Sequence, residues 1–288
     1  MFEYIDFFIK LWYNSTRNTN GGVFVAIIPK FFFDAVVALG VEEDKEIKWI
    51  GTGFLVGRKE ENLDSYTIYL ITNYHIVENK SGILVRFNQK DGNECRDYRV
   101  VLKDSTKELF SKHQTADVIA IQIMPEFLKK NNSEFNWFAL DKHALSLQQM
   151  QSTDVLEGSI VYSLGFPINM IGTNRKTPVC RIGCISKISD LFENRELEEY
   201  LIDLQAIPGN SGAPVINRPE DLFIKGTNHN ASANLIGIIS GTIDYSEQCD
   251  ESTCPKEHEK SSGFAIVHPV DTIVEVIEKE YIRRRDLH

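Results

Sequence analysis

The amino-acid sequence predicts an all-β protein made of two small β-barrels and a C-terminal helix. Short apolar runs of strand length recur along most of the chain, and Gly or Asn residues separate many of them. Few segments show helical spacing of apolar residues, which favours barrels or sandwiches over a mixed α/β fold. With 288 residues, of which 42% are hydrophobic, the chain is long enough to bury a substantial core.

The expected strands follow one another along the chain. For the first barrel they are AVVALGV (35–41), GTGFLVG (51–57), TIYLITN (67–73), ILVRF (83–87), RVVLK (99–103) and DVIAIQI (117–123). For the second barrel they are SIVYSLG (159–165), CRIGCISKI (180–188), YLIDLQ (200–205), APVI (213–216), LIGIISG (235–241) and GFAIV (263–267). A polar and mixed stretch from Lys129 to Glu157 is expected to connect the two halves.

Both ends of the chain are expected to be helical. Residues 270–281 carry apolar side chains at helical spacing, and Arg283, Arg284 and Arg285 follow where cations complement a helix C-terminus. The first residues, MFEYIDFFIKLWYN, predict a short amphipathic helix that packs on the domain, with contact to a membrane or a partner as the alternative. They lack the features of a signal peptide, and no run is long enough to span a bilayer.

The domain boundaries follow from these elements. We expect an N-terminal segment (1–34), a first barrel (35–140), and a unit that comprises the connection, the second barrel and the C-terminal helix (141–288).

Charge and cysteine content exclude several classes of function. The formal net charge of −10 argues against nucleic acid or an anionic membrane as the main partner. The five cysteines have no regular disulfide spacing, so a reducing, cytoplasmic compartment is expected. Cys249, Cys254 and His258 lack a fourth zinc ligand, and neither a metal nor an organic cofactor is expected.

Ser211 is the strongest candidate for chemistry. It lies in the stretch IPGNSGAPVI, where turn-forming residues precede an apolar run. A serine hydroxyl becomes nucleophilic when a histidine takes its proton and a carboxylate orients that histidine. His75, at the end of YLITNYHIV, and Asp117, directly before an apolar run, are the candidates for these roles. Taken singly, each has an ordinary structural interpretation as a turn serine, a structural histidine or an aspartate at a strand start.

These blocks together resemble the chymotrypsin-fold, or trypsin-like, serine peptidases. GTGFLVG with YLITNYHIV is similar to the block around the catalytic histidine, TADVIAIQI to the aspartate block, and GNSGAPVI to the nucleophile block. The motifs TNYHIV, LGFP, PGNSG, LIGI and GFAI are most similar to the bacterial HtrA or Deg type. The resemblance covers roughly residues 35–275 and implies two six-stranded antiparallel barrels, without space for the PDZ peptide-binding module common in HtrA enzymes.

The resemblance implies a catalytic role for each matching residue. Ser211 would attack a carbonyl carbon, His75 would act first as base and then as acid, and Asp117 would orient the imidazolium. The backbone N–H groups of Gly209 and Ser211 would form the oxyanion hole, helped by that of Asn210.

The resemblance also implies how a substrate binds. Ser240 stands where the family carries a serine close to the catalytic aspartate, and Gly241 and Thr242 would pair with an extended substrate. The implied walls of the specificity pocket are Gln205, Ala206, Ile207, Thr242 and Gly263. Because these side chains are uncharged, a small or medium apolar residue is expected in the pocket rather than Lys or Arg.

Several positions depart from the pattern of secreted relatives. Asn210 replaces an aspartate that pairs with a newly cut N-terminus, so activation by that route is not expected. Ile76 replaces a cysteine that often follows the histidine, and Ala213 replaces a second glycine. The polar insertion Asp244 to Ser262 falls between two pocket walls, where it either overhangs the cleft or forms a solvated loop.

Two functional hypotheses follow. The first is an intracellular serine endopeptidase that forms an acyl-enzyme on Ser211 and acts on protein or peptide substrates. Its activity is expected to be gated, by the N-terminal segment or by the Asp244 to Ser262 loop, or to be regulated by a protein partner. The alternative is a catalytically silent pseudo-peptidase of the same fold that acts as a peptide-binding module, using the same cleft, or as a regulatory module. An esterase with the same triad is less favoured, because GNSG lacks the G-x-S-x-G elbow of α/β-hydrolases.

Overall fold

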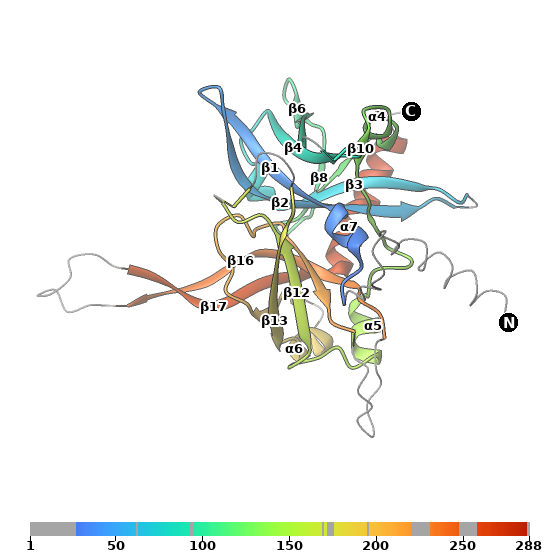
Figure 1. Cartoon of the computed structure of the whole chain (residues 1–288). Coiled ribbons are helices and arrows are strands. Elements are labelled where there is room, and N and C mark those ends of the chain that lie inside the picture. Colours follow the sequence, from blue (N-terminus) through green and yellow to red (C-terminus); the bar gives the residue numbers. More distant parts are fainter. Residues whose placement is uncertain are drawn as a thin grey trace, which may run out of the picture.

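The fold is known from a computed structural model that describes residues 27–61, 63–92, 95–168, 170–171, 176–194, 196–219, 231–247 and 258–286. The predicted N-terminal helix in MFEYIDFFIKLWYN lies outside these residues, as do Cys249 and Cys254. The described strands form two main units, which Figure 1 shows one above the other. None of the described helices is long and apolar enough to cross a membrane.

The first unit is a nine-stranded sheet with a separate small hairpin. The strands of the sheet are β1 (Val36–Glu43), β2 (Glu46–Lys59), β3 (Tyr66–Thr72), β4 (Gly82–Gln89), β5 (Cys95–Val101), β8 (Ser111–Lys112), β9 (Ile119–Gln122), β10 (Ser133–Glu134) and β11 (Phe138–Ala139). The hairpin consists of β6 (Lys103–Asp104) and β7 (Lys107–Glu108). The main hydrogen-bonded path is β10-β4-β1-β2-β3-β9-β8. This unit differs from the expected six-stranded barrel, because β10 and β11, from the expected connection, extend its sheet.

The second unit is a closed antiparallel barrel with the order β12-β13-β14-β17-β16-β15, which confirms the expected six-stranded barrel. Its strands are β12 (Ile160–Gly165), β13 (Val179–Lys187), β14 (Tyr200–Asp203), β15 (Pro214–Asn217), β16 (Leu235–Glu247) and β17 (His258–Pro269). The described helices are α2 (Lys30–Ala35), α3 (Tyr74–Val77), α4 (Pro125–Lys130), α5 (Leu147–Ser152), α6 (Ser189–Glu193) and α7 (Val270–Arg285).

Each of the predicted apolar runs coincides with a strand, and the predicted C-terminal helix is α7.

The expectation of a solvated loop over Asp244 to Ser262 is wrong for its described parts. Residues 244–247 and 258–261 continue β16 and β17 as an antiparallel ladder, from Asp244↔Ser261 to Glu247↔His258. The two strands form an arm that extends beyond the barrel (Figure 1). Backbone pairing overrides the polar composition that suggested a loop.

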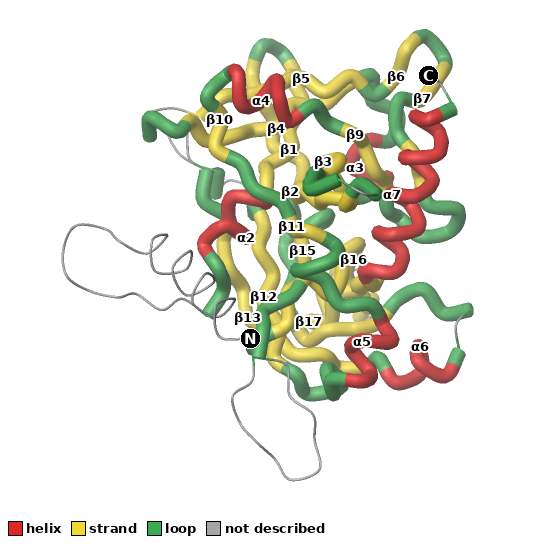
Figure 2. The backbone as a smooth tube through the Cα atoms, turned by 90° about the vertical axis from the view of Figure 1, so that its right-hand side faces the viewer, coloured by secondary structure: helices red, strands yellow, loops and turns green. Residues whose placement is uncertain are grey.

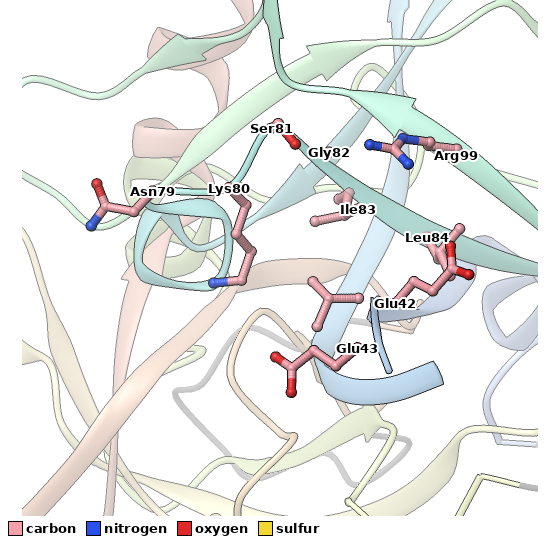
Figure 3. Close-up of a pocket in the computed structure, with 10 residues that line it drawn as sticks. Glu42, Glu43, Asn79, Lys80, Ser81, Gly82, Ile83, Leu84 and Arg99 are labelled. Atoms are coloured by element: carbon pink, nitrogen blue, oxygen red, sulfur yellow. The ribbon is translucent and has the colours of Figure 1, made fainter. Parts of the chain in front are cut away.

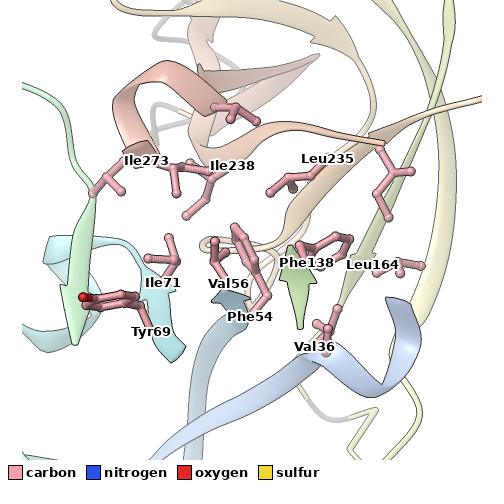
Figure 4. Packing of buried hydrophobic residues seen from close by; sticks show 14 of the residues in the cluster. Val36, Phe54, Val56, Tyr69, Ile71, Phe138, Leu164, Leu235, Ile238 and Ile273 are labelled. Carbon is pink, nitrogen blue, oxygen red and sulfur yellow. The ribbon is translucent and has the colours of Figure 1, made fainter. Parts of the chain in front are cut away.

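The central strands of the first unit are buried on both faces. Along β1, Val37 and Leu39 face a core inside the first unit, whereas Val36 and Ala38 face a core between the units. Strands β2, β3 and β9 divide their side chains in the same alternating way. A strand with two covered faces reads as a continuous apolar run. Figure 4 shows side chains of both units and of α7 meeting in the core between the units.

Helix α7 follows the second barrel and packs on the first unit. Val270, Ile273, Val276 and Ile277 enter the core between the units, and Figure 2 shows the helix running along the side of the first unit. Buried Glu280 accepts a hydrogen bond from Ser111 Oγ at 2.7 Å. Helix α7, which follows the second barrel in the sequence, therefore stabilises the sheet of the first unit.

The core between the units predicts the effect of truncating Phe138. This ring is fully buried, with centroids 4.5 Å from Phe32 and 5.8 Å from Phe54. Phe138→Ala should lower the free energy of unfolding, measured in urea, by about 3–5 kcal/mol, because it removes buried contacts and leaves a cavity. The control is Phe127→Ala, where the side chain is 53% exposed. A loss for Phe138→Ala no larger than that of the control would contradict this description of the core.

Candidate active site

His75 and Asp117 form a hydrogen-bonded pair at one end of the first sheet. His75 lies on the short helix α3, directly after β3, and Asp117 lies in the turn before β9. The distance between His75 Nδ1 and Asp117 Oδ2 is 2.5 Å, and His75 N donates to Asp117 Oδ1 at 3.0 Å. Buried Asn73 adds a third bond, from Nδ2 to the carbonyl oxygen of Asp117 at 2.8 Å. The carboxylate is thus held against one ring nitrogen, and the other is left for chemistry.

The turn that carries Ser211 rests on two strands of the first unit. Thr52 N, in β2, donates to Ser211 O at 3.0 Å, and Thr72 Oγ1, at the end of β3, donates to Thr52 O at 2.8 Å. A Cβ atom placed on Gly212, which has φ +81°, would lie only 2.0 Å from Thr52 O. Because that approach excludes any side chain, the glycine after Ser211 is required for this contact.

Gly209 also sits in a backbone contact that excludes a side chain. Its φ is +99°, and a Cβ atom there would lie 2.4 Å from Phe166 O and 2.7 Å from Ile168 N. Thr52 Oγ1 donates to Gly209 O at 2.7 Å and accepts from Phe166 N at 2.9 Å. The Gly209 carbonyl therefore points to buried Thr52, which fixes the orientation of this part of the turn.

One predicted oxyanion donor is wrong. The N–H group of Asn210 donates to Ile207 O at 3.0 Å, because Ile207 to Asn210 form a tight turn. In the part of the chain that the structure describes, the N–H groups of Gly209 and Ser211 have no such backbone acceptor. These two amides remain the candidates for stabilising an oxyanion.

The Asn210 side chain is buried at 1% exposure, and its Oδ1 has no hydrogen-bond partner among the described residues. A carboxylate in its place would require a buried cation, whereas a neutral amide carries a smaller desolvation penalty. That no new N-terminus pairs with this position stays a prediction.

The Ser211 turn of the second unit lies close to α3, the helix that carries His75, at the junction of the two units. A Cβ atom on Gly51 would lie 2.5 Å from Ile76 Cδ1 and 3.4 Å from Ser211 O, so α3 and the serine turn approach within one side chain of each other. His75 and Asp117 are hydrogen-bonded, but no hydrogen bond joins Ser211 Oγ to His75 among the described residues. Catalytic hydrogen bonds are often longer before substrate binds.

The predicted walls of the specificity pocket come from neighbouring strands. Leu204 N, directly before Gln205, donates to Gly263 O at 3.1 Å, and Thr242 is paired with Ala265. The structure thus brings the Gln205 to Ile207 segment, which follows β14, beside β17, and β17 in turn pairs with β16. Ser240 does not support Asp117 as expected, because its hydroxyl donates to Ile266 O at 3.5 Å, within its own sheet.

A shallow pocket of about 300 Å³ lies beside α3, between the end of β1 and the β4–β5 edge. Figure 3 shows Glu42 and Glu43 on the opposite side of this pocket from Arg99, with Lys80 at one end. None of the predicted specificity residues lines it. Its mixed charge distinguishes it from the uncharged walls expected beside Ser211.

Sequence reasoning missed three residues that hold the site together: Thr52, Thr72 and Asn73. Each is fully buried and makes a hydrogen bond to the site or its support. The available signal was their position, since Thr52 is the one polar residue in GTGFLVG, and Thr72 and Asn73 end the run TIYLITN. A buried polar group within an apolar run needs a partner.

Among the described residues, no group of three or more His, Cys, Asp or Glu side chains is placed to hold a metal ion. The predicted absence of a zinc site at Cys249, Cys254 and His258 stays a prediction, because the two cysteines lie outside the described residues.

A closed antiparallel barrel beside a second, mostly antiparallel sheet, with the serine turn at their junction, defines a trypsin-like fold. The sequence matches the trypsin-like peptidase domain family over residues 51–223, more than half of the chain. The chain therefore belongs to the trypsin-like peptidase family.

Several solved structures are similar to this chain. Two are of the HtrA-type protease AlgW, with a tripeptide (18% identity, TM-score 0.48) and with a decapeptide (17% identity, TM-score 0.48). They cover 86% and 87% of this chain, which spans only 60% and 65% of theirs. A third is the protease domain of MamO from Magnetospirillum magneticum, with 14% identity, a TM-score of 0.45, and coverage of 85% of this chain and 97% of that one. Among curated proteins, none matches the sequence significantly.

The close backbone contacts of Gly209 predict that replacing it with alanine lowers the free energy of unfolding more than the same replacement at Gly158. Gly158 also has a positive φ, +86°, but no atom lies within 4 Å of a Cβ placed there. Gly158→Ala should lower the free energy of unfolding by about 1–2 kcal/mol through backbone strain alone. Gly209→Ala adds a clash with backbone atoms and should cost more than about 3 kcal/mol. Equal losses in urea unfolding would show that the Gly209 contact is not a steric constraint.

Proposed function

We propose that this protein is a serine endopeptidase that cleaves protein substrates through an acyl-enzyme on Ser211. The observation that carries the proposal is the 2.5 Å hydrogen bond between His75 Nδ1 and Asp117 Oδ2, at the junction where the Ser211 turn is seated. A carboxylate on Nδ1 fixes the tautomer in which Nε2 is the proton acceptor. Membership of the trypsin-like peptidase family supports the same chemistry.

In the first half of the proposed reaction, Ser211 Oγ attacks the carbonyl carbon of a peptide bond while His75 Nε2 takes the hydroxyl proton. The negative charge that develops on the carbonyl oxygen is stabilised by the N–H groups of Gly209 and Ser211. Asp117 stabilises the imidazolium that forms. The C–N bond then breaks, and the imidazolium gives its proton to the leaving amine.

In the second half, water replaces the amine. His75 Nε2 takes a proton from the water molecule as its oxygen attacks the ester carbonyl carbon. The C–O bond to Ser211 breaks, and the proton returns to Ser211 Oγ. The products are a carboxylic acid and the free enzyme, without any cofactor.

The proposed substrate is an extended peptide that adds to β16. The pairing of β15 with β16 ends at Pro214↔Ile238, and Ile239 makes the last described backbone hydrogen bonds on this edge, with Ala213 O and Gly212 N, whereas β16 continues to Glu247. An extended chain beside Ser240 and Gly241 would bring its scissile bond to Ser211. The neighbouring segment from Gln205 to Ile207 carries no charge, which favours an apolar side chain in the pocket.

The proposal includes a reducing, intracellular location and control by a protein partner. Cys95, Cys180 and Cys184 are free thiols, which suits such a compartment. Fractionation of cells that express the protein checks the location.

The alternative is a peptide-binding module that has the fold without the activity. The observation that favours it is the lack of a described hydrogen bond between Ser211 Oγ and His75. Both functions use the same cleft, so peptide binding alone does not separate them.

Covalent labelling of Ser211 and Ser211-dependent peptide cleavage distinguish the peptidase from the peptide-binding module. Wild-type protein should react covalently with a fluorophosphonate probe and cleave a peptide library, and Ser211→Ala should abolish labelling and lower kcat by as much as roughly 10⁶-fold. The matched control is Ser163→Ala, because the Ser163 hydroxyl is buried without a partner among the described residues. That control should label and cleave like wild type. A folded wild-type protein that neither labels at Ser211 nor cleaves any peptide would favour the binding module.

A further inference from the structure

Asp117 is presented to His75 by a tight turn between two strands. Strands β8 and β9 pair through Ser111↔Ala120 and Lys112↔Ile119, which leaves residues 113–118 as their connection. The turn is closed by His113 N, which donates to Val118 O at 2.9 Å, and by Val118 N, which donates to Ala116 O at 2.9 Å. Asp117 is the last residue but one of this turn.

The Asp117 carboxylate receives little support from packing. Its side chain is 31% exposed, and its described side-chain hydrogen bonds go to His75. The direction of the carboxylate therefore depends on the backbone of the turn. Any group that fixes the N–H groups of residues 115 and 116 also fixes where Asp117 points.

The His113 ring is such a group. Its side chain is only 11% exposed, and Nδ1 accepts hydrogen bonds from Ala116 N at 3.0 Å and from Thr115 N at 3.4 Å. Without this acceptor, the N–H of buried Ala116 would lose its described partner. The imidazole thus occupies the inside of the turn and replaces a backbone carbonyl as its acceptor.

The other ring nitrogen anchors the turn to helix α7. His113 Nε2 lies 3.0 Å from Glu275 Oε2. Because Nδ1 accepts two N–H groups, the hydrogen of the neutral ring is assigned to Nε2, which donates to the carboxylate. Lys279 Nζ, one turn further along α7, donates to Lys112 O at 2.8 Å. The start of the turn is therefore tied to a helix that packs in the core between the units.

We propose that His113 is a positioning residue for Asp117, because its Nδ1 holds the backbone of the turn in the orientation that directs the carboxylate to His75. The proposal rests on the proposed serine peptidase function. His113 touches neither substrate nor reacting atoms, so it acts through Asp117. Glu275 contributes less than Nδ1, since its side chain is 70% exposed on the wall of a solvent-filled cleft of about 580 Å³.

Two variants distinguish the effect of the hydrogen-bond acceptor at His113 Nδ1 from the effect of the volume of the ring. His113→Leu removes the acceptor, and His113→Asn restores one, because the amide oxygen of asparagine takes the place of Nδ1. His113→Leu should lower kcat roughly 10- to 100-fold with little change in KM, as expected for a small misplacement of a catalytic group. His113→Asn should recover most of that loss.

The matched control is His143→Leu. His143 is a partly buried histidine whose Nδ1 likewise accepts a backbone N–H, from Ala139 at 3.1 Å, and burial lowers its pKa. It lies in the connection between the units, away from the Asp117 turn. This variant should lose stability as His113→Leu does but keep its kcat.

A spectroscopic readout tests the positioning role even if the protein proves inactive. The short hydrogen bond between His75 Nδ1 and Asp117 should give a strongly deshielded proton resonance at low pH, and its loss in Asp117→Asn assigns it. The signal should weaken or move in His113→Leu and return in His113→Asn. Unchanged resonance and kcat in folded His113→Leu would overturn the proposal. Absence of Ser211-dependent hydrolysis in wild type would instead refute the proposed function, and the resonance would still decide the role of His113.

Discussion

The Ser211 turn of the second unit is held by one threonine of the first. Thr52 is fully buried; its N–H donates to Ser211 O, and its hydroxyl bridges Gly209 O and Phe166 N. These bonds cross the junction between the units, so the position of the serine depends on the position of β2. The buried hydroxyl both donates and accepts a hydrogen bond. Moving it would lower stability, because each lost bond leaves a buried polar group without a partner.

The rest of the architecture keeps that junction rigid. Strands β1, β2, β3 and β9 bury both faces, so that they cannot shift without opening either the core inside the first unit or the core between the units. His75 and Asp117 stand directly after β3 and before β9, which pair in register from Tyr69↔Gln122 to Thr72↔Ile119. The ladder, which both cores fix in place, therefore sets the positions of the two segments that carry His75 and Asp117.

The main strands and the C-terminal helix could be predicted from the sequence, whereas the short strands and the side-chain hydrogen bonds that hold the site could not. Two-sided burial produces long apolar runs, which is why the main strands were predictable. The two-residue strands β8, β10 and β11 carry no periodic signal, so their contribution to the first sheet was hidden. The side-chain bonds of Thr52, Asn73 and His113 join residues distant in sequence or depend on turn geometry, and neither composition nor spacing reports them. The Asn210 amide was misassigned for the same reason, since the tight turn that consumes it depends on local backbone angles.

The position of α7 at the far end of the described chain has a consequence for biosynthesis. Strand β9 ends at Gln122, whereas α7 begins at Val270. At translation rates of about 5–20 residues per second, a ribosome needs on the order of 10 s to make the intervening chain. During that interval the face of the first sheet that contacts Ile273 and Ile277 remains uncovered, and the Asp117 turn lacks its anchor at Glu275. The nascent polypeptide thus passes through a stage in which its first strands expose apolar side chains and the Asp117 turn lacks its contact with Glu275, and both conditions end when α7 docks.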